Sequence, residues 1–325
     1  LRSRAGYGAL GPVDPDLMRT SVIIPAYNAD DTLDRCLAAV WASEQPPDQL
    51  IVVDDGSDQP IPGALRIPVR GGPGRARNLG AQHANGDVLI FLDADVLIRP
   101  DTLALLTAQL AQESGLGAVQ TVYDTACEVP GFASQFQNLL QHWNVTRAAG
   151  ADFHGLSSYC VAIRRAAFDA AGGFDEQVGR ATVEDDNLGQ ALNAAGWPVR
   201  VASRIRVSHL ARFTRRRLFG RMRAMAEDKV RSLRRQPRLA NVPPHRTHHR
   251  PAFLFAAAAV PAALALLPVA PLVSVGLFGA VVVLHLPFAA FLAEEKNCLF
   301  ALEGTAMMCA LALAAAAGAM TGVLS

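Results

Sequence analysis

Two carboxylates at the end of a short apolar run are the residues in this sequence best suited to chemistry. Asp93 and Asp95 follow the strand-favouring run Val88–Leu92 and are separated by one residue. Side chains at this spacing share a face of a strand, and they can converge where the strand turns into a loop. Such a pair of hard oxygen ligands suits Mg²⁺ or Mn²⁺, which in turn suits a phosphate-bearing ligand. An isolated Asp-x-Asp can equally be two solvated loop residues, so the rest of the chain has to decide.

A second group of acids, Glu184, Asp185 and Asp186, opens a predicted helix that Gly196 ends. Negative charge is favoured in the first turn of a helix, so this cluster can be a charged helix start with no chemical role. The glycine-rich run Gly71–Gly80 opens another predicted helix, where the backbone could approach a phosphate. It contains no Gly-Lys-Ser/Thr and does not follow the first strand, so it is neither a P-loop nor a dinucleotide fingerprint.

Alternating strands and helices must position these groups. Thr20–Pro25 and Gln49–Val53 have the composition of strands buried on both faces, and the helical pattern between them has Asp30 or Asp31 as its expected cap. These three elements predict a βαβ unit with a right-handed crossover. Ligands of open α/β sheets bind at the carboxyl ends of such strands. Further strands are expected at Arg66–Val69, Val88–Leu92, Ala118–Val122, 155–163 and Pro198–Ala202, and further helices after Gly71, after Pro100, over Gly131–Ala149 and from Glu184.

Composition sets broad limits on the class of protein. The chain has 325 residues, 51% hydrophobic and 6% aromatic, with 30 Lys+Arg against 29 Asp+Glu. The acids cluster before Asp186 and the arginines crowd residues 200–250, which suggests a basic face for a membrane surface or for phosphate groups. Five scattered cysteines without a Cys-x-x-Cys argue against a disulfide framework and a zinc site. Leu1–Arg19 has no apolar h-region, so we expect no signal peptide there.

The C-terminal third has the character of a membrane-associated segment. Arginines alternate with apolar residues from Arg212 to Arg238, which predicts a basic amphipathic helix on a membrane surface. A solvated charged face is the alternative, and no nucleic-acid-binding motif accompanies the arginines. Three apolar segments follow, at Phe253–Val269, Leu272–Ala293 and Ala301–Leu324. They can form three membrane crossings, a hairpin plus an interfacial helix, or buried helices of a soluble domain.

These patterns divide the chain into four parts. We expect a tail over residues 1–19, an α/β domain over 20–211, a basic interfacial segment over 212–250 and a transmembrane region of two to three helices over 251–325. Because the arginines directly precede the first apolar segment, the α/β domain should lie on the cytoplasmic side of the inner (plasma) membrane. The expected location is therefore a multi-pass membrane protein with its α/β domain in the cytoplasm.

Four short motifs, taken together, resemble those of the family 2 inverting glycosyltransferases with a GT-A fold. The motifs are Ser21–Asn28, Val53–Ser57, Ala76–Gly80 and Phe91–Asp95, in that order and spacing. The resemblance covers about Thr20 to His209, and the C-terminal apolar segments resemble those of bacterial membrane-associated members. It implies a Rossmann-like GT-A domain followed by transmembrane helices, and a UDP- or GDP-sugar as donor.

The resemblance also implies roles for individual residues. Pro25 and Ala26 would line the base pocket, Asp55 would contact the base or ribose, and Arg77 would lie near the nucleotide. Asp93 and Asp95 would be the Asp-x-Asp pair that holds the ribose and a Mg²⁺ or Mn²⁺ ion on the diphosphate. His209 falls where many members carry a histidine near the diphosphate, although a lone histidine can also be structural.

On the acceptor side, Gly172–Asp175 and Glu184-Asp185 resemble family motifs. Asp185 would be the general base, with Gly173 and Glu184 beside the acceptor. Like-charge neighbours would raise the pKa of Asp185 and the helix N-terminus would lower it, and the sequence leaves the balance open. Asn187 stands where the family often has a further Asp. The Gln-x-x-Arg-Trp signature of processive synthases is absent, which favours transfer of a single sugar.

The expected function is thus a membrane-anchored, metal-dependent, inverting glycosyltransferase of polysaccharide or glycolipid biosynthesis, acting on a lipid-linked or saccharide acceptor. A polyprenyl-phosphate sugar synthase is the alternative within the same chemistry. A catalytically silent membrane subunit that binds nucleotide sugar is the alternative from another class. A sugar-nucleotide pyrophosphorylase would need a glycine-rich basic loop after the first strand, where this chain has Ala26-Tyr27-Asn28.

Overall fold

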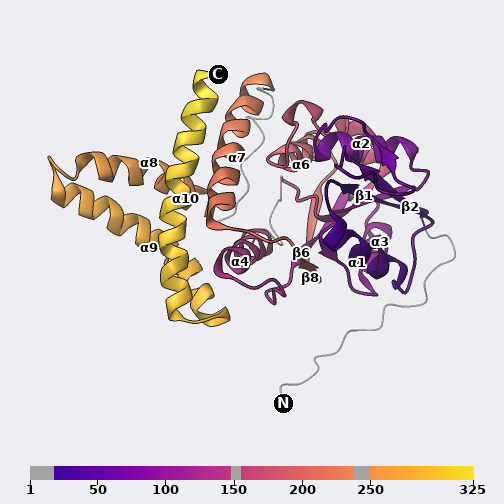
Figure 1. The fold of residues 1–325 in the computed structure, drawn as a ribbon, viewed down its shortest axis with the longest axis horizontal. Coiled ribbons are helices and arrows are strands. Elements are labelled where there is room, and N and C mark those ends of the chain that lie inside the picture. Colours follow the sequence, from indigo (N-terminus) through magenta and orange to yellow (C-terminus); the bar gives the residue numbers. More distant parts are fainter. Residues whose placement is uncertain (1–17, 148–154, 237–248) are drawn as a thin grey trace, which may run out of the picture.

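The computed structural model describes residues 18–147, 155–236 and 249–325, so most of the expected N-terminal tail lies outside the described residues. Within these ranges an α/β domain lies beside a helical C-terminal part (Figure 1). The domain is built on an eight-stranded sheet of order β3-β2-β1-β4-β7-β6-β8-β5. Its strands are β1 (Thr20–Ala26), β2 (Gln49–Asp54), β3 (Leu65–Arg66), β4 (Val88–Leu92), β5 (Val96–Leu97), β6 (Ala118–Tyr123), β7 (Cys160–Arg164) and β8 (Val199–His209).

A parallel core carries the predicted acids to one edge of this sheet. Strand β1 pairs in parallel with both β2 and β4, which confirms the predicted βαβ unit. Because parallel strands end on the same side, Asp55 after β2 and Asp93 after β4 lie at the same edge. The antiparallel strand β7 begins there too, where the Asp93 N–H donates to the carbonyl of Tyr159 at 2.9 Å.

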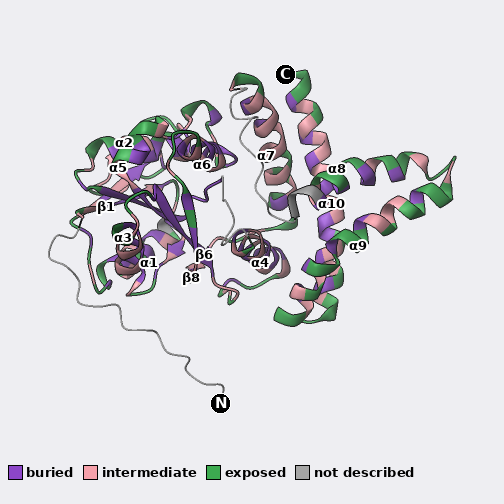
Figure 2. Cartoon of the chain, turned by 180° about the vertical axis from the view of Figure 1, so that it is seen from behind, coloured by how far each residue is buried: buried purple, intermediate pink, exposed green. Residues whose placement is uncertain are grey.

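Helices cover both faces of the sheet, as the apolar runs require (Figure 2). Helices α1 (Asp30–Trp41) and α3 (Thr102–Gln112) pack on one face, and α2 (Pro73–His83), α5 (Arg165–Ala171) and α6 (Glu184–Ala194) pack on the other. Side chains of β1 alternate between the two cores. Val22 and Ile24 meet Leu33 of α1, whereas Ile23 lies in the cluster that contains Leu188 of α6. Strands buried on both faces must be apolar throughout, which explains their near-continuous hydrophobic sequence.

Several predicted boundaries differ from the structure. Helix α1 already begins at Asp30, with Ala29 at the N-cap position and no side-chain cap, so the predicted cap at Asp30 or Asp31 is wrong. The third strand is confined to Leu65–Arg66. Strand β8 continues to His209, well beyond the predicted end at Ala202, because it pairs first with β6 and then with β5.

Five helices complete the described chain, together with a short 3₁₀ turn at Glu176–Val178. They are α4 (Phe132–Thr146), α7 (Arg215–Arg235), α8 (His249–Leu266), α9 (Pro271–Glu295) and α10 (Cys298–Leu324). Helices α9 and α10 are candidate membrane spans by length and composition, with mean hydropathies of 2.2 and 1.9, while the apolar part of α8, Ala252–Leu266, is shorter. Helices α8 and α9 form a hairpin that extends away from the sheet, and α10 runs beside α7 (Figure 1).

Helix α7 is joined to the segment around α6 by a polar network. Asp228 of α7, 6% exposed, accepts hydrogen bonds from Arg180 Nε and Thr182 Oγ1, both at 2.6 Å. Burial alone would raise the pKa of Asp228, but the hydrogen bonds from Arg180 and Thr182 outweigh it and hold this pKa below its ordinary value. Lys229 Nζ lies 2.6 Å from Asp186 Oδ2 of α6. Helix α7 is therefore fixed to the α/β domain by charge pairs as well as by packing.

Asp228→Ala should lower the free energy of unfolding by about 1–3 kcal/mol, because it leaves the buried Thr182 hydroxyl without its acceptor. The loss should be full at neutral pH and fade as the pH falls through the lowered pKa of Asp228, where the wild-type carboxylate is itself neutralised. Chemical denaturation of detergent-solubilised protein measures it. The matched control is Glu113→Ala, which removes the exposed pair with Arg200 and should cost less than about 1 kcal/mol. Equal losses in the two variants would contradict a buried network.

Candidate active site

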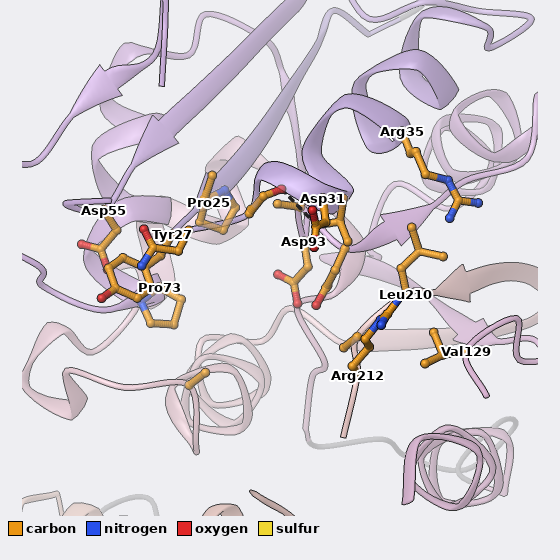
Figure 3. A pocket seen from close by; sticks show the side chains of 18 of the residues that line it. Pro25, Tyr27, Asp31, Arg35, Asp55, Pro73, Asp93, Val129, Leu210 and Arg212 are labelled. Atoms are coloured by element: carbon orange, nitrogen blue, oxygen red, sulfur yellow. Dashed lines mark hydrogen bonds between the residues drawn. The ribbon is translucent and has the colours of Figure 1, made fainter. Parts of the chain in front are cut away.

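A cleft of about 870 Å³ opens at the carboxyl ends of β1, β2 and β4. Figure 3 shows Asp55, Tyr27 and Pro73 at one end of it, Asp93 near the centre, and Arg212 and Val129 at the other end. All the residues predicted to bind the donor line this cleft, as does the second Asp of the Asp-x-Asp pair. They are Pro25, Ala26, Asp55, Arg77, Asp93 and Asp95.

A second cavity of about 180 Å³ adjoins the first. The two share Arg77, Asp93 and Asp95 in their walls. The second is also lined by the predicted base, by one of the two predicted acceptor-side residues, by the predicted metal-binding histidine and by two glutamines of α4. These are Glu184, Asp185, His209, Gln137 and Gln141. The Asp-x-Asp pair therefore lies between two compartments, an arrangement suited to a reaction between two substrates.

At the outer end of the cleft, Asp55 shapes the loop that precedes α2. This carboxylate is 4% exposed and accepts the backbone N–H groups of Gly71 and Gly72, both at 2.8 Å. The sequence suggests these two amides as phosphate ligands, but in the structure both donate to Asp55. The guanidinium of Arg70 lies 3.9 Å from the ring centroid of Tyr27, so flat groups line this end of the cleft.

Arg77 connects the two compartments. Its guanidinium is almost fully buried, with Nη2 lying 2.7 Å from Asp93 Oδ1 and Nη1 lying 3.3 Å from Glu184 Oε1. The same group lies 5.2 Å from the ring centroid of Phe174. A buried cation requires such partners, because its desolvation is otherwise uncompensated. Arg77 thereby fixes the Asp-x-Asp loop relative to the start of α6.

His209 reaches Asp95 through the pairing of β5 with β8. In this short antiparallel ladder Val96 pairs with His209, and His209 Nε2 lies 3.6 Å from Asp95 Oδ2. The imidazole stacks on Tyr123, with ring centroids 4.5 Å apart. Burial would raise the pKa of Asp95, but the neighbouring His209 outweighs it and the pKa is lowered. Asp95 is therefore ionised at neutral pH and can attract a cation.

The same residues fit a divalent cation that shares its ligands with a substrate. Among the described ranges, no group of three His, Cys, Asp or Glu side chains is arranged to hold a metal unaided. Asp95, His209 and Asp93 nevertheless all line the second cavity. Mg²⁺ commonly takes one or two protein carboxylates and completes its shell with phosphate oxygens and water. A site in which the protein supplies only some of the metal ligands therefore suits a metal ion that is also bound to a diphosphate.

Asp185 stands at the start of α6 on the far side of Arg77. Its oxygens accept the N–H groups of Asp186 at 2.8 Å and of Ser158 at 3.4 Å. Burial and the charges of Glu184 and Asp186 raise the pKa of Asp185 to about 7, against the opposing charge of Arg77. The balance that the sequence left open therefore falls on the raised side, with burial as the largest cause. A carboxylate with such a pKa is suited to general-base chemistry near neutral pH.

Two predicted acceptor-side residues have structural contacts of their own. Gly173 does not line either cavity; it has φ +74°, and a Cβ there would lie 2.9 Å from Asn78 Oδ1. Glu184 lines the second cavity, but Oε1 meets Arg77 and Oε2 accepts the Thr182 N–H at 2.8 Å. Glu184 thus holds the start of α6 against Arg77, whereas Gly173 is required by its backbone conformation and by the close Asn78 side chain.

The structure adds site residues that sequence reasoning missed. Arg217, assigned from the sequence to the membrane-surface helix, lines both cavities. Gln137 and Gln141 line the second cavity from α4, as does Arg221 from α7. The two glutamines are spaced i, i+4, which places them on one face of a helix, but nothing in the sequence shows which cavity that face meets.

Arg77→Met should destabilise the protein by about 3–5 kcal/mol, because the buried Glu184 and the partly buried Asp93 would lose their cation. Arg77→Lys should cost less, since an ammonium can pair with one of the two carboxylates. Thermal and urea unfolding of the detergent-solubilised chain measure both. Arg75→Met, at an exposed position of the same helix, is the control and should change little. A loss in Arg77→Met no greater than in Arg75→Met would refute the bridging role.

Comparison with known proteins agrees with this geometry. Residues 21–172 match the model of the family described as glycosyl transferase family 2. An uncharacterised glycosyltransferase of Haemophilus influenzae is 34% identical over 96 residues, which cover 26% of this chain and 38% of that protein. The poly(ribitol-phosphate) beta-N-acetylglucosaminyltransferase TarS of Staphylococcus aureus is 27% identical over 161 residues, covering 41% of this chain and 28% of that protein. The chain thus spans well under half the length of either relative.

A solved structure resembles nearly the whole chain. The mannosyltransferase PcManGT from Pyrobaculum calidifontis, determined in complex with GDP-Man and Mn²⁺, superimposes with a TM-score of 0.62 at 20% identity, covering 97% of this chain and 91% of that one. At this identity the likeness establishes the fold. The α/β domain therefore has the GT-A fold, and residues 21–172 within it match the model of glycosyl transferase family 2.

Proposed function

We propose that the chain is a membrane-anchored, metal-dependent, inverting glycosyltransferase that moves a sugar from a nucleotide-diphosphate sugar to an acceptor hydroxyl. One observation carries the proposal. The Asp-x-Asp pair and a carboxylate whose pKa is raised to about 7 line adjoining cavities that share Arg77 as a wall. This arrangement supports a donor compartment and an acceptor compartment on either side of the point where a sugar would be transferred.

The larger cleft is the proposed donor site. Its outer end, with Pro25, Ala26 and the Tyr27–Arg70 pair, would take the nucleoside, and the diphosphate would lie toward Asp93 and Asp95. A Mg²⁺ or Mn²⁺ ion held by Asp95, Asp93 and His209 would neutralise charge that develops on the leaving diphosphate. Arg217, which faces the same space, would add a positive charge of the protein's own.

Asp185 is the proposed general base. Direct displacement at the anomeric carbon inverts its configuration and needs one carboxylate that removes the acceptor's hydroxyl proton during attack. Because the pKa of Asp185 is about 7, a substantial fraction is ionised at neutral pH, and it binds a proton more strongly than an ordinary aspartate. Arg77 keeps this base close to the donor compartment without neutralising it fully.

The surroundings of the smaller cavity support a lipid-linked acceptor. Helix α4, which supplies Gln137 and Gln141 to the cavity, also packs against the apolar helices α9 and α10 through Phe136. The acceptor compartment is therefore adjacent to the candidate membrane elements. The arginines of α7 favour anionic lipid on the cytoplasmic side of an inner (plasma) membrane.

A polyprenyl-phosphate sugar synthase is a second candidate, favoured by one observation. Arg217 and Arg221 both line the acceptor cavity, where they could bind the phosphate of a lipid carrier. A phosphate acceptor is already ionised and needs little help from a base. The two candidates therefore differ in how much they depend on Asp185.

Asp185→Asn should abolish transfer to a hydroxyl acceptor while donor binding persists, because the amide cannot take the proton. In the wild type, the transfer rate should rise with pH below about 7 and level off above it, since the base acts only when deprotonated. Single-turnover assays across this range measure both effects. Asp186→Asn is the control: it should keep activity and move the pH limb downward, because the Asp186 charge helps to raise the pKa of Asp185. Full activity of Asp185→Asn would refute the base and favour the carrier-phosphate acceptor.

Donor and metal binding can be tested without turnover. Saturating UDP- or GDP-sugar with Mn²⁺ should raise the unfolding temperature, since a ligand at 100 times its Kd adds about 2.7 kcal/mol to the folded state. Asp95→Ala should lose the metal-dependent part of this shift, and Glu113→Ala should keep it. A thermal-shift titration with each nucleotide sugar, with and without Mn²⁺, gives the result. A folded wild-type protein that shows no shift with any nucleotide sugar would contradict the proposed donor site.

A further inference from the structure

The α8–α9 hairpin presents an apolar surface that no described part of the domain covers. It extends away from the sheet in both views of the molecule (Figures 1 and 2). Between Arg250 and Glu294 the sequence contains no Asp, Glu, Lys or Arg, and Ser274 and His285 are its only strongly polar side chains. Val269 and Leu272, near the tip, are 77% and 87% exposed. An apolar surface of this kind without a single charge fits the hydrocarbon of a bilayer.

The hairpin is too short to reach water on the far side of a membrane. The apolar part of α8 runs from Ala252 to Leu266, which at 1.5 Å per residue is about 22 Å, against roughly 30 Å for the hydrocarbon core. The free part of α9 has a similar length. Large apolar side chains of α9 are exposed on one face as far as Leu286, while Ser274, Val281 and His285 are buried on the other. Beyond this point Phe288 and Leu292 are buried in the cluster that contains residues of α4.

The tip itself is built for an apolar surrounding. Leu266–Leu272 contains no polar side chain, and Pro268 and Pro271 have no N–H to satisfy. The N–H groups of Val269 and Ala270 donate to the Leu266 carbonyl at 3.0 and 2.7 Å. A backbone polar group without a partner is costly in hydrocarbon, and these two N–H groups have their partner within the turn. The hydroxyl of Ser274 also turns inward and donates to the Ala263 carbonyl at 2.7 Å.

Helix α10 is long and apolar enough to span a membrane, yet it packs against α7 along most of its length. Near its start, Glu303 pairs with Arg215 of α7. Farther along, a Cβ on Gly318 would lie 2.0 Å from the Arg223 carbonyl oxygen, so the two backbones are in contact. At its end, Arg234 Nη1 donates to the Val323 carbonyl at 2.7 Å.

This contact decides where α10 can lie. Helix α7 carries eight arginines and one lysine against two acids, and it is bound to the α/β domain through Asp228 and Lys229. If α10 crossed the bilayer, it would carry these charges into the hydrocarbon, where each is strongly unfavourable. With α7 and α10 both at the membrane surface, the arginines can meet lipid headgroups instead.

We propose that the chain enters the bilayer from one face only: the α8–α9 hairpin turns within the hydrocarbon, α10 lies at the surface with α7, and no described segment crosses. The inference rests on the proposed membrane anchoring and specifies its geometry. It replaces the expected multi-pass arrangement, and it places the C-terminal residue Ser325 on the same side as the active site. The hairpin would then hold the acceptor cavity at the surface of one leaflet.

The side on which Ser325 lies is measured on the full chain in sealed membrane vesicles. A short protease-cleavable epitope is added after Ser325, and cleavage of the α/β domain serves as the reference. Both sites should be cut together in vesicles that expose the domain and protected together in vesicles of opposite orientation. Cleavage of one site with protection of the other would overturn the proposal. If alkaline carbonate instead strips the chain from the membrane, the anchoring assumed under the proposed function fails, whatever the transferase activity.

The position of the tip is tested by placing an aspartate at a valine in the tip and, as a control, at an equally exposed valine elsewhere. Val269 at the tip and Val69 in a loop of the α/β domain are 77% and 75% exposed. Val269→Asp should weaken partitioning into phosphatidylcholine vesicles about tenfold or more, because the charge would enter hydrocarbon. Val69→Asp should leave partitioning unchanged. Co-sedimentation measures both, and unaltered circular dichroism shows that each variant is folded. Undiminished partitioning of Val269→Asp would place the tip in water and overturn the proposal.

Discussion

The buried guanidinium of Arg77 is the interaction on which the site depends. Taking an arginine out of water is costly, and the cost is offset only if its partners are fixed in position. Those partners, Asp93 and Glu184, come from the end of β4 and the start of α6, which are far apart in sequence. Close packing of α2 against β1 sets the position of Arg77, since a Cβ on Gly80 would lie 2.4 Å from Ile23 Cγ2. One ion-paired arginine thus keeps the two cavities adjacent.

Helix α7 performs the corresponding task between the site and the apolar helices. One face binds the segment around Asp185 through Asp228 and Lys229, and the opposite face contacts the backbone of α10 at Gly318. Arg217 from the same helix faces both cavities. A single charged helix therefore lines the cavities, supports the proposed base and packs against the apolar C-terminal helices. The arginines of α7 therefore meet different surroundings: Arg217 lines the cavities, whereas Arg234 contacts the end of α10.

The local sequence predicted most of the sheet and the acids at its edge, because buried strands and helix starts leave strong local patterns. Strand β5 was missed: two residues carry no periodicity, and the ladder that brings His209 to Asp95 exists only once β8 is in place. The role of Gln137 was missed for a similar reason, since tertiary packing decides which cavity a helix face lines. The apolar C-terminal segments were recognisable from composition, but their arrangement depends on the contact between α7 and α10.

The raised pKa of Asp185 has a consequence for stability. An aspartate in the unfolded chain titrates near 4, whereas Asp185 in the fold titrates at about 7. Between these values the folded state binds the extra proton, so this group makes the protein less stable as the pH rises through that window and leaves it so above. The buried ion pairs of Arg77 and Asp228 flank Asp185, and they stabilise the part of the fold that the Asp185 charge destabilises. The burial that raises the pKa of Asp185 thus destabilises the fold, and the neighbouring ion pairs offset this loss. The same ion pairs hold Asp185 in one position, as a reacting group requires.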